Sequence, residues 1–247
     1  MSGRAVRVLE SVDAVAGYTT YIDLIRPIIQ DKRIVSTGMT REVERVGAAL
    51  DIAMGGKSCA VVSSGDPGVY AMAGLVFEMC RERKIPIAGP GRIDTDNPGA
   101  LLQVEVVPGI PALCSGASLL GAPLTHDFAA ISLSDLLTPW ELIESRLDAA
   151  AKSDFVIVLY NPMSKKRKWH LEKARQIVLQ YRDEDTPVGI VVSAMRRDQD
   201  VRIIPLRELH LADVNMQTII FIGSSASVRY LDFMVTPRGY RKKYKMR

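Results

Sequence analysis

Residues 61–70 read Val61-Val62-Ser63-Ser64-Gly65-Asp66-Pro67-Gly68-Val69-Tyr70, and this stretch decides the fold that the sequence predicts. It follows on from the apolar run 59–62, which is typical of a strand buried in a parallel sheet. Residues 69–80 then place apolar side chains at helical spacing. Asp66 and Pro67 predict the start of this helix, because a carboxylate can cap the first turn and proline fits there. Open α/β sheets bind ligands where a strand gives way to a helix in this manner, although an ordinary βα loop has the same pattern.

Outward from this stretch, the chain alternates between segments with helical spacing and segments with the apolar character of strands. The expected helices span 4–12, 21–29, 41–54, 112–120, 139–151 and 169–181, and the expected strands span 12–16, 34–35, 102–107, 129–133, 155–160, 188–192, 201–205 and 218–222. This alternation predicts the α/β class. Gly121-Ala122-Pro123 breaks a helix, so we expect two α/β domains, residues 1–125 and 126–247.

Length and composition are those of a globular protein with a sizeable core. The chain has 247 residues, of which 47% are hydrophobic and 24% are charged. No apolar run approaches the ~20 residues that a membrane span needs, and residues 1–7 lack the hydrophobic segment of a signal peptide. We therefore expect a cytoplasmic protein that has no membrane partner.

Cysteine and histidine are few and scattered. Cys59, Cys80 and Cys114 are widely spaced in apolar contexts, which favours core thiols in a reducing compartment over disulfides or a redox site. The three histidines lie far apart in the sequence, so no metal site is predicted.

The net charge of +4 is small, but the basic residues concentrate in the C-terminal half. The basic runs are Lys165-Lys166-Arg167-Lys168, Arg196-Arg197 and the tail residues Arg238, Arg241, Lys242, Lys243, Lys245 and Arg247. Such runs usually form a solvated face. Nucleic acid is not expected as a partner, because no basic motif interleaved with aromatic residues is present. A substrate that carries many carboxylates would also suit a basic cleft.

Several motifs, in one order, resemble those of a known family. The octet Ser-Ser-Gly-Asp-Pro-Gly-Val-Tyr at 63–70 resembles the signature of the S-adenosylmethionine-dependent tetrapyrrole methylases. Further similar segments are Val-Pro-Gly-Ile-Pro-Ala at 107–112, Gly-Ala-Pro-Leu-Thr-His-Asp-Phe at 121–128, Ile-Ser-Leu-Ser-Asp at 131–135, Pro-Trp-Glu at 139–141, Tyr-Asn-Pro at 160–162 and Thr-Pro-Arg-Gly-Tyr at 236–240. The later motifs are most similar to the C17-methyltransferases of cobalamin biosynthesis, which act on precorrin-3B or cobalt-precorrin-3.

This resemblance implies a fold, a cofactor and a site. Family members have two α/β domains with S-adenosylmethionine in the cleft between them, and they are usually homodimers. The residues implied to contact the cofactor are Ser64, Gly65, Asp66, Val69, Ala112, Tyr160, Asn161, Pro162, Ser193 and Ala194. Small residues in these loops would let the backbone approach the cofactor closely. Simple turn chemistry is the alternative explanation of the same residues.

The C17 branch also contracts the macrocycle, so a proton donor or base near the substrate is expected. His126 and Asp127 are the candidates for this catalytic role. The candidates for binding the substrate are Ser132, Ser134 and Asp135 through hydrogen bonds, and Arg167, Arg196 and Arg197 through its carboxylates. A well-capped interdomain linker would explain the segment from His126 to Asp135 equally well. Any cobalt would arrive inside the substrate.

The chain starts at a segment that family members reach only after a first strand and a Gly-Pro-Gly loop, so this strand and loop are expected to be absent. This difference has three possible explanations: a truncated start, a divergent form or a defective protein. If the loop is essential, the chain would be a non-catalytic protein that binds the cofactor or a tetrapyrrole. A methylase of another tetrapyrrole position is a further alternative, which the later motifs disfavour.

Overall fold

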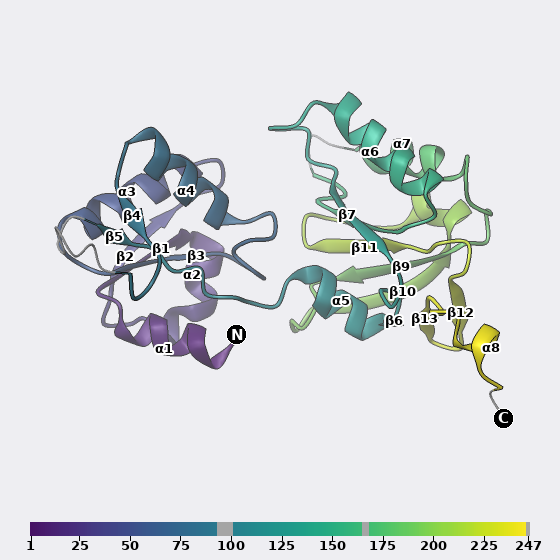
Figure 1. Cartoon of the computed structure of the whole chain (residues 1–247), viewed down its shortest axis with the longest axis horizontal. Helices are drawn as coiled ribbons and strands as arrows, with labels where there is room; N and C mark the ends of the chain where they lie inside the picture. Colours follow the sequence, from purple (N-terminus) through teal and green to yellow (C-terminus); the bar gives the residue numbers. More distant parts are fainter. Residues whose placement is uncertain (93–100, 165–167, 246–247) are drawn as a thin grey trace. The chain divides into compact units, whose positions relative to one another are not determined.

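The structure is a computed structural model that describes residues 1–92, 101–164 and 168–245 (Figure 1). The chain divides into two compact units, Met1–Pro111 and Ala112–Arg247. Each unit combines sheets with helices, which confirms the predicted α/β class. Within the part of the chain that is described, no helix has the length and apolar character needed to cross a lipid bilayer.

The first unit is built on a parallel sheet of three strands in the order β2-β1-β3. These strands are β1 (Ala14–Tyr18), β2 (Arg33–Thr37) and β3 (Cys59–Val62). Val15 and Ala16 in the central strand β1 are buried, as expected for a strand that is covered on both faces. A separate parallel pair joins β4 (Ile87–Ala88) to β5 (Leu102–Gln103). Among the described residues, β3 pairs with β1 alone.

Five helices accompany the strands in the described part of the first unit. They are α1 (Gly3–Ser11), α2 (Thr19–Ile25), the 3₁₀ helix η1 (Arg26–Ile28), α3 (Glu42–Met54) and α4 (Met72–Glu82). The helix predicted for 21–29 ends as η1, because Pro27 cannot donate the backbone hydrogen bond that an α-helix requires. α3 packs the apolar side chains of Val46 and Leu50 against Cys80 of α4.

The prediction that Asp66 and Pro67 open α4 is wrong. The first residue of α4 is Met72, and its N-cap is Ala71. Tyr70 has a φ of 51°, in the left-handed region, so the backbone cannot pass through it as a right-handed helix. The carboxylate of Asp66 therefore does not cap α4 and makes other contacts.

The second unit is built on a five-stranded sheet in the order β10-β9-β11-β8-β7. Its strands are β7 (Phe128–Ser132), β8 (Val156–Tyr160), β9 (Pro187–Val192), β10 (Asp200–Pro205) and β11 (Thr218–Ile222). β7 and β8 are parallel, and β11 is antiparallel to both β8 and β9. Consequently, β7, β8 and β9 run in one direction and end at the same edge of the sheet.

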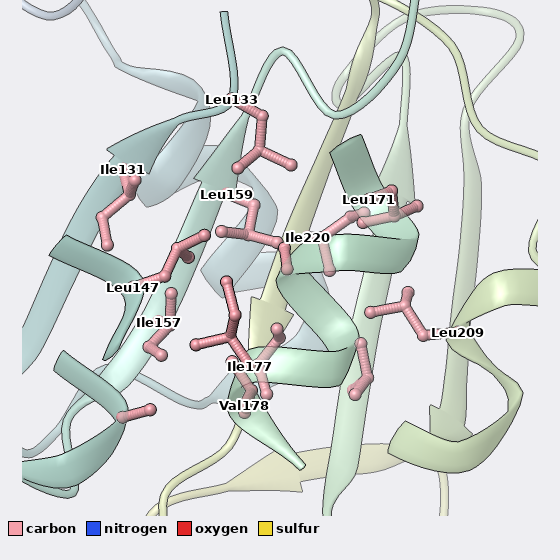
Figure 2. Packing of buried hydrophobic residues seen from close by; sticks show 14 of the residues in the cluster. Ile131, Leu133, Leu147, Ile157, Leu159, Leu171, Ile177, Val178, Leu209 and Ile220 are labelled. Atoms are coloured by element: carbon pink, nitrogen blue, oxygen red, sulfur yellow. The ribbon is translucent and has the colours of Figure 1, made fainter. Parts of the chain in front are cut away.

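Helices cover both faces of this sheet. The helices of the second unit are α5 (Ala112–Leu120), α6 (Trp140–Lys152), α7 (His170–Val178), the 3₁₀ helix η2 (Leu206–Leu211) and α8 (Tyr240–Lys243). Ile157 and Leu159 of β8 share a core with α6 and α7 (Figure 2). The intervening Val158 belongs to a second core, which includes Leu120 of α5. Successive side chains of a strand point to opposite faces, so β8 is buried on both sides.

The two units divide between Pro111 and Ala112, whereas the predicted domain boundary follows Thr125. α5 belongs to the second unit because it lies directly on that unit's sheet: a Cβ built on Gly116 would come within 2.8 Å of the Phe221 ring. A further three-stranded sheet consists of β12 (Val228–Tyr230), β13 (Phe233–Val235) and β6 (Gly121–Ala122). Gly121, which directly follows α5, therefore starts a strand inside the second unit.

The three cysteines differ in burial. Cys80 is buried and Cys59 is half-buried, but Cys114 on α5 is exposed, so the prediction of a core thiol is wrong for Cys114. Burial raises the pKa of the Cys59 thiol to about 11, and it also raises the pKa of Cys80. Both of these residues are therefore neutral thiols at physiological pH.

We predict that an aromatic disulfide reagent at pH 8 modifies one thiol rapidly in the folded protein, and that this thiol is Cys114. With a pKa of about 11, only roughly one Cys59 side chain in a thousand is the reactive thiolate at that pH. The absorbance of the released thiolate would report the rate. The variant Cys114→Ser should lose the fast phase, and a fast phase that survives in this variant would contradict the assignment.

Candidate functional site

One carboxylate links two loops of the first unit. Asp66 Oδ1 accepts a hydrogen bond from the Gly68 amide at 2.8 Å, and Oδ2 accepts one from the Gly109 amide at 2.9 Å. Hydrogen bonds to an ionised acceptor are stronger than those between neutral groups. The loop that follows β3 is thus joined to residues 43 positions further along the chain.

The same two loops meet backbone to backbone. Gly65 has a φ of 77°, a conformation that favours glycine. A Cβ built on Gly109 would overlap the carbonyl oxygen of Gly65 and would lie 3.3 Å from the Asp66 Cα. Glycine is therefore required at 109 for the two loops to approach this closely.

The start of α1 supports the second loop. The Ser2 hydroxyl accepts a hydrogen bond from the Ala5 amide at 3.3 Å and donates one to the Pro108 carbonyl at 3.3 Å. Arg4 forms an ion pair with Glu105, and its Nε donates to that carboxylate at 2.6 Å. Residues 105–109 are therefore held both by α1 and by the Asp66 carboxylate.

Ser63 has a buried hydroxyl at the carboxyl end of β3. Among the described residues, its Oγ has no hydrogen-bond partner. Ser64 and Gly65 are exposed beside it, while Val69 is half-buried. Leaving a buried polar atom unpaired costs about 1–3 kcal/mol. A ligand that hydrogen-bonds to Ser63 at this point would recover part of that energy.

In the second unit, most of the predicted residues gather at the edge where β7, β8 and β9 end. Ser132 ends β7 opposite Tyr160, which ends β8, and Ser193 directly follows β9. The predicted residues that continue the chain from these three strand ends are Ser134, Asp135, Asn161, Pro162, Ala194, Arg196 and Arg197. Arg167 lies outside the described residues. Ligands of α/β sheets bind at such an edge.

Ser132 connects the ends of β7 and β8. Its Oγ accepts hydrogen bonds from the Asn161 side-chain amide at 2.9 Å and from the Ser134 backbone amide at 3.2 Å. The Tyr160 hydroxyl accepts a bond from the Leu113 amide at 3.0 Å, so the first turn of α5, which begins at Ala112, is attached to the same edge. The backbone of Asn161 is left-handed, with a φ of 52°.

Ser193 uses its side chain within its own loop. It is buried and left-handed, with a φ of 49°. Its Oγ lies 2.8 Å from the Asp198 carboxylate and 2.8 Å from the Gln217 side-chain oxygen. The backbone of Ser193 is engaged as well: its amide donates to the Gln217 carbonyl at 3.0 Å, and its carbonyl accepts from the Arg196 amide at 2.9 Å. Further along this loop, Arg197 is exposed.

His126 and Asp127 lie away from the other predicted residues. They precede β7, whereas Ser132 and Ser134 lie at its far end. A five-residue strand is about 16 Å long, so the two groups of residues occupy opposite edges of the sheet. Both side chains are exposed, and His126 Nδ1 accepts a hydrogen bond from the Asp127 amide at 2.8 Å. The structure does not bring this pair together with the strand ends that carry the remaining residues.

Sequence reasoning did not find His170. Its Nε2 lies 2.9 Å from Asp135 Oδ2, at the edge that also carries Ser132 and Asn161. The two residues are 35 positions apart, and only the fold brings the start of α7 beside the end of β7. A lone histidine in a helical segment gave no signal of this pairing.

Comparison with known proteins settles the family. The sequence model of the family named Tetrapyrrole (Corrin/Porphyrin) Methylases matches residues 1–210 of the chain. The chain belongs to this family. The resemblance carried by the motif at 63–70 and by the later motifs is thereby confirmed.

Relatives of this tetrapyrrole methylase include proteins named for one step of cobalamin biosynthesis. A probable cobalt-factor III C(17)-methyltransferase of Salmonella typhimurium is 40% identical over 97% of this chain and 93% of the relative. A cobalt-factor III methyltransferase of Priestia megaterium is 46% identical over 98% of this chain. The chain spans only 43% of the length of the Priestia protein. The crystal structure of the methyltransferase CobJ is similar with a TM-score of 0.83 and 30% identity, over 96% of this chain and 93% of that one.

We predict that Gly109→Ala destabilises the first unit by about 1–3 kcal/mol, because its methyl group would force the Gly65 and Gly109 loops apart. Gly38→Ala is the matched control, since a Cβ built at Gly38 has no atom within 4 Å. Urea unfolding would measure both variants, and the control should stay within about 0.5 kcal/mol of the wild type. Equal stability of the two variants would show that the loops tolerate separation.

Proposed function

We propose that the chain is an S-adenosylmethionine-dependent methyltransferase that methylates C17 of cobalt-factor III in cobalamin biosynthesis. The observation that carries this proposal is the 40% identity with the Salmonella C(17)-methyltransferase, which extends over nearly the full length of both proteins. The names of the Salmonella and Priestia relatives favour the cobalt-containing substrate over precorrin-3B. The family likeness is also what supports the expected homodimer.

The residues of the first unit fit the proposed cofactor. S-adenosylmethionine supplies an electrophilic methyl group on a positively charged sulfur. The Ser63 hydroxyl, which has no partner among the described residues, offers a hydrogen bond, and the small, exposed residues Ser64 and Gly65 let a ligand approach the loop closely. Val69 offers an apolar contact. Asp66 is assigned to holding the loop, since both of its oxygens already accept backbone hydrogen bonds.

In the second unit, the edge formed by the ends of β7, β8 and β9 would supply the remaining contacts. Ala112, Tyr160, Asn161, Pro162, Ser193 and Ala194 are retained as cofactor contacts, and Ser132, Ser134, Asp135, Arg196 and Arg197 as substrate contacts. Arg196 and Arg197 suit the carboxylates at the rim of a tetrapyrrole. His126 and Asp127 are not retained as catalytic residues, because they precede β7 at the opposite edge of the sheet.

Transfer of a methyl group from a sulfonium to a carbon atom breaks one S–C bond and forms one C–C bond. It needs little acid–base assistance at the methyl group, and alignment of donor and acceptor can supply much of the acceleration. A loop held rigid by Asp66, Gly109 and α1 suits this demand, because it presents its backbone groups in one geometry.

We predict that Asp66→Ala weakens the binding of S-adenosylhomocysteine by about tenfold or more, because both loop hydrogen bonds are lost. Asp13→Ala is the matched control. Asp13 also accepts two hydrogen bonds, from the Ser58 amide and hydroxyl, but it lies at the start of β1, at the other edge of the same sheet. Isothermal titration calorimetry of the wild type and both variants would measure the affinities.

Turnover would be tested with cobalt-factor III and S-adenosylmethionine carrying a ¹³C-labelled methyl group. The expected product carries the label at C17, as read by nuclear magnetic resonance. Binding of S-adenosylhomocysteine without any turnover would favour the non-catalytic alternative. A label at another carbon would favour a methylase of a different position.

A further inference from the structure

The two tryptophans of the chain lie beside one buried histidine. Trp140 is the first residue of α6, and Trp169 directly precedes α7. The ring of Trp169 stacks on that of His170, with centroids 3.9 Å apart and planes at 23°. Trp140 meets both rings edge-on, at 4.8 and 5.0 Å. The side chain of His170 is only 2% exposed, so packing holds its ring in one orientation.

Core stability does not explain why this position holds a histidine. The His170 Nε2 donates to Asp135 Oδ2 at 2.9 Å, which leaves Nδ1 as the second polar atom of the ring. This Nδ1 is buried and has no hydrogen-bond partner among the described residues. An unpaired buried polar atom costs about 1–3 kcal/mol, and a phenylalanine ring would stack on the tryptophans without that cost. The bond from Nε2 to Asp135 is therefore the property that distinguishes histidine here.

Asp135 leads into a turn that exposes two adjacent leucines. Leu136 is 73% exposed and Leu137 is 92% exposed. Just before them, Leu133 is fully buried in the core beneath α6 and α7 (Figure 2). After them, the chain enters α6 at Trp140. The turn is thus fixed at both ends and through Asp135, although its leucines point into water.

We propose that His170 is a positioning residue for substrate binding: through Asp135 it holds Leu136 and Leu137 in the conformation that contacts the flat face of the tetrapyrrole macrocycle. This inference rests on the proposed function and names the apolar part of the same substrate site. A tetrapyrrole presents a wide apolar face with acidic groups at its rim. The turn lies at the sheet edge that carries Ser132 and Asn161, where polar contacts with the substrate are proposed.

Fixing the turn before binding is the advantage of this arrangement. If a turn becomes ordered only on binding, the free energy of binding is less favourable by about 0.5–1.5 kcal/mol for each side chain that is immobilised. The bond between His170 and Asp135 removes part of this cost, because it restricts the turn in the unbound protein. The corresponding cost falls on the stability of the folded protein, in which His170 Nδ1 has no hydrogen-bond partner among the described residues.

The tryptophans provide a direct measurement. Because Trp140 and Trp169 are the only tryptophans in the sequence, the intrinsic fluorescence of the protein arises beside this turn. A bound tetrapyrrole absorbs at the wavelengths where tryptophan emits and therefore quenches it. Titration with cobalt-factor III gives a dissociation constant that does not depend on turnover, so failure of methylation and failure of this inference are separable.

Two substitutions separate positioning from packing. His170→Phe keeps the ring but removes the donor, and it should raise the dissociation constant for cobalt-factor III about fivefold or more. His170→Gln places an amide N–H near the position of Nε2 and should stay within about twofold of the wild type. His170→Phe should melt at or above the wild-type temperature, because the unpaired Nδ1 is gone. Its affinity for S-adenosylhomocysteine should be unchanged.

The double variant Leu136→Ser with Leu137→Ser tests the contact surface itself. Its dissociation constant for cobalt-factor III should rise about tenfold or more, with an unchanged mass in sedimentation equilibrium. Wild-type affinity of either His170→Phe or the leucine variant would overturn the proposal. Equal weakening by His170→Phe and His170→Gln, with lower melting temperatures, would make His170 merely structural. A lower oligomeric mass of the leucine variant would show that the leucines contact a second copy of the chain instead.

Discussion

The first unit depends on the requirement that two loops meet without an intervening side chain. Asp66 supplies the attraction, through one hydrogen bond within its own loop and one to the Gly109 amide. Gly65 and Gly109 supply the space, since a methyl group at 109 would overlap the Gly65 carbonyl. Neither contribution suffices alone, because a charged acceptor cannot hold two loops that collide.

Backbone strain accompanies several of the candidate loops. Tyr70, Asn161 and Ser193 are not glycines, yet each has a positive φ, between 49° and 52°. Such a conformation costs of order 1–3 kcal/mol at each residue and persists only where the surroundings enforce it. Asn161 is held by the hydrogen bond that its side-chain amide donates to Ser132, and Ser193 by the side chains of Asp198 and Gln217. Asn161 directly follows β8, and Ser193 directly follows β9. Tyr70 lies just before α4.

The sequence predicted the elements far better than their ends and their contacts. An apolar run located β3, whose residues pack into two cores of the first unit, and apolar periodicity located α3 and α7, which each bury one face. It misplaced the start of α4, since the left-handed Tyr70 leaves no mark on periodicity. The family motifs marked the Asp66 loop and the end of β7, but nothing in them indicates that Asp66 holds Gly109 or that His170 pairs with Asp135. Both of these contacts join residues far apart in the chain, and only the folded topology creates them.

The division between Pro111 and Ala112 has a consequence for synthesis of the protein on the ribosome. Each unit consists of one uninterrupted stretch of chain. The hydrogen bonds that fix the Asp66 loop, including those of Ser2 and Gly109, have both partners within the first 111 residues. Domains generally fold as units during translation, with the N-terminal one first. The first unit can therefore complete its loop contacts as soon as residue 111 has left the ribosome, while later parts of the second unit are still being made.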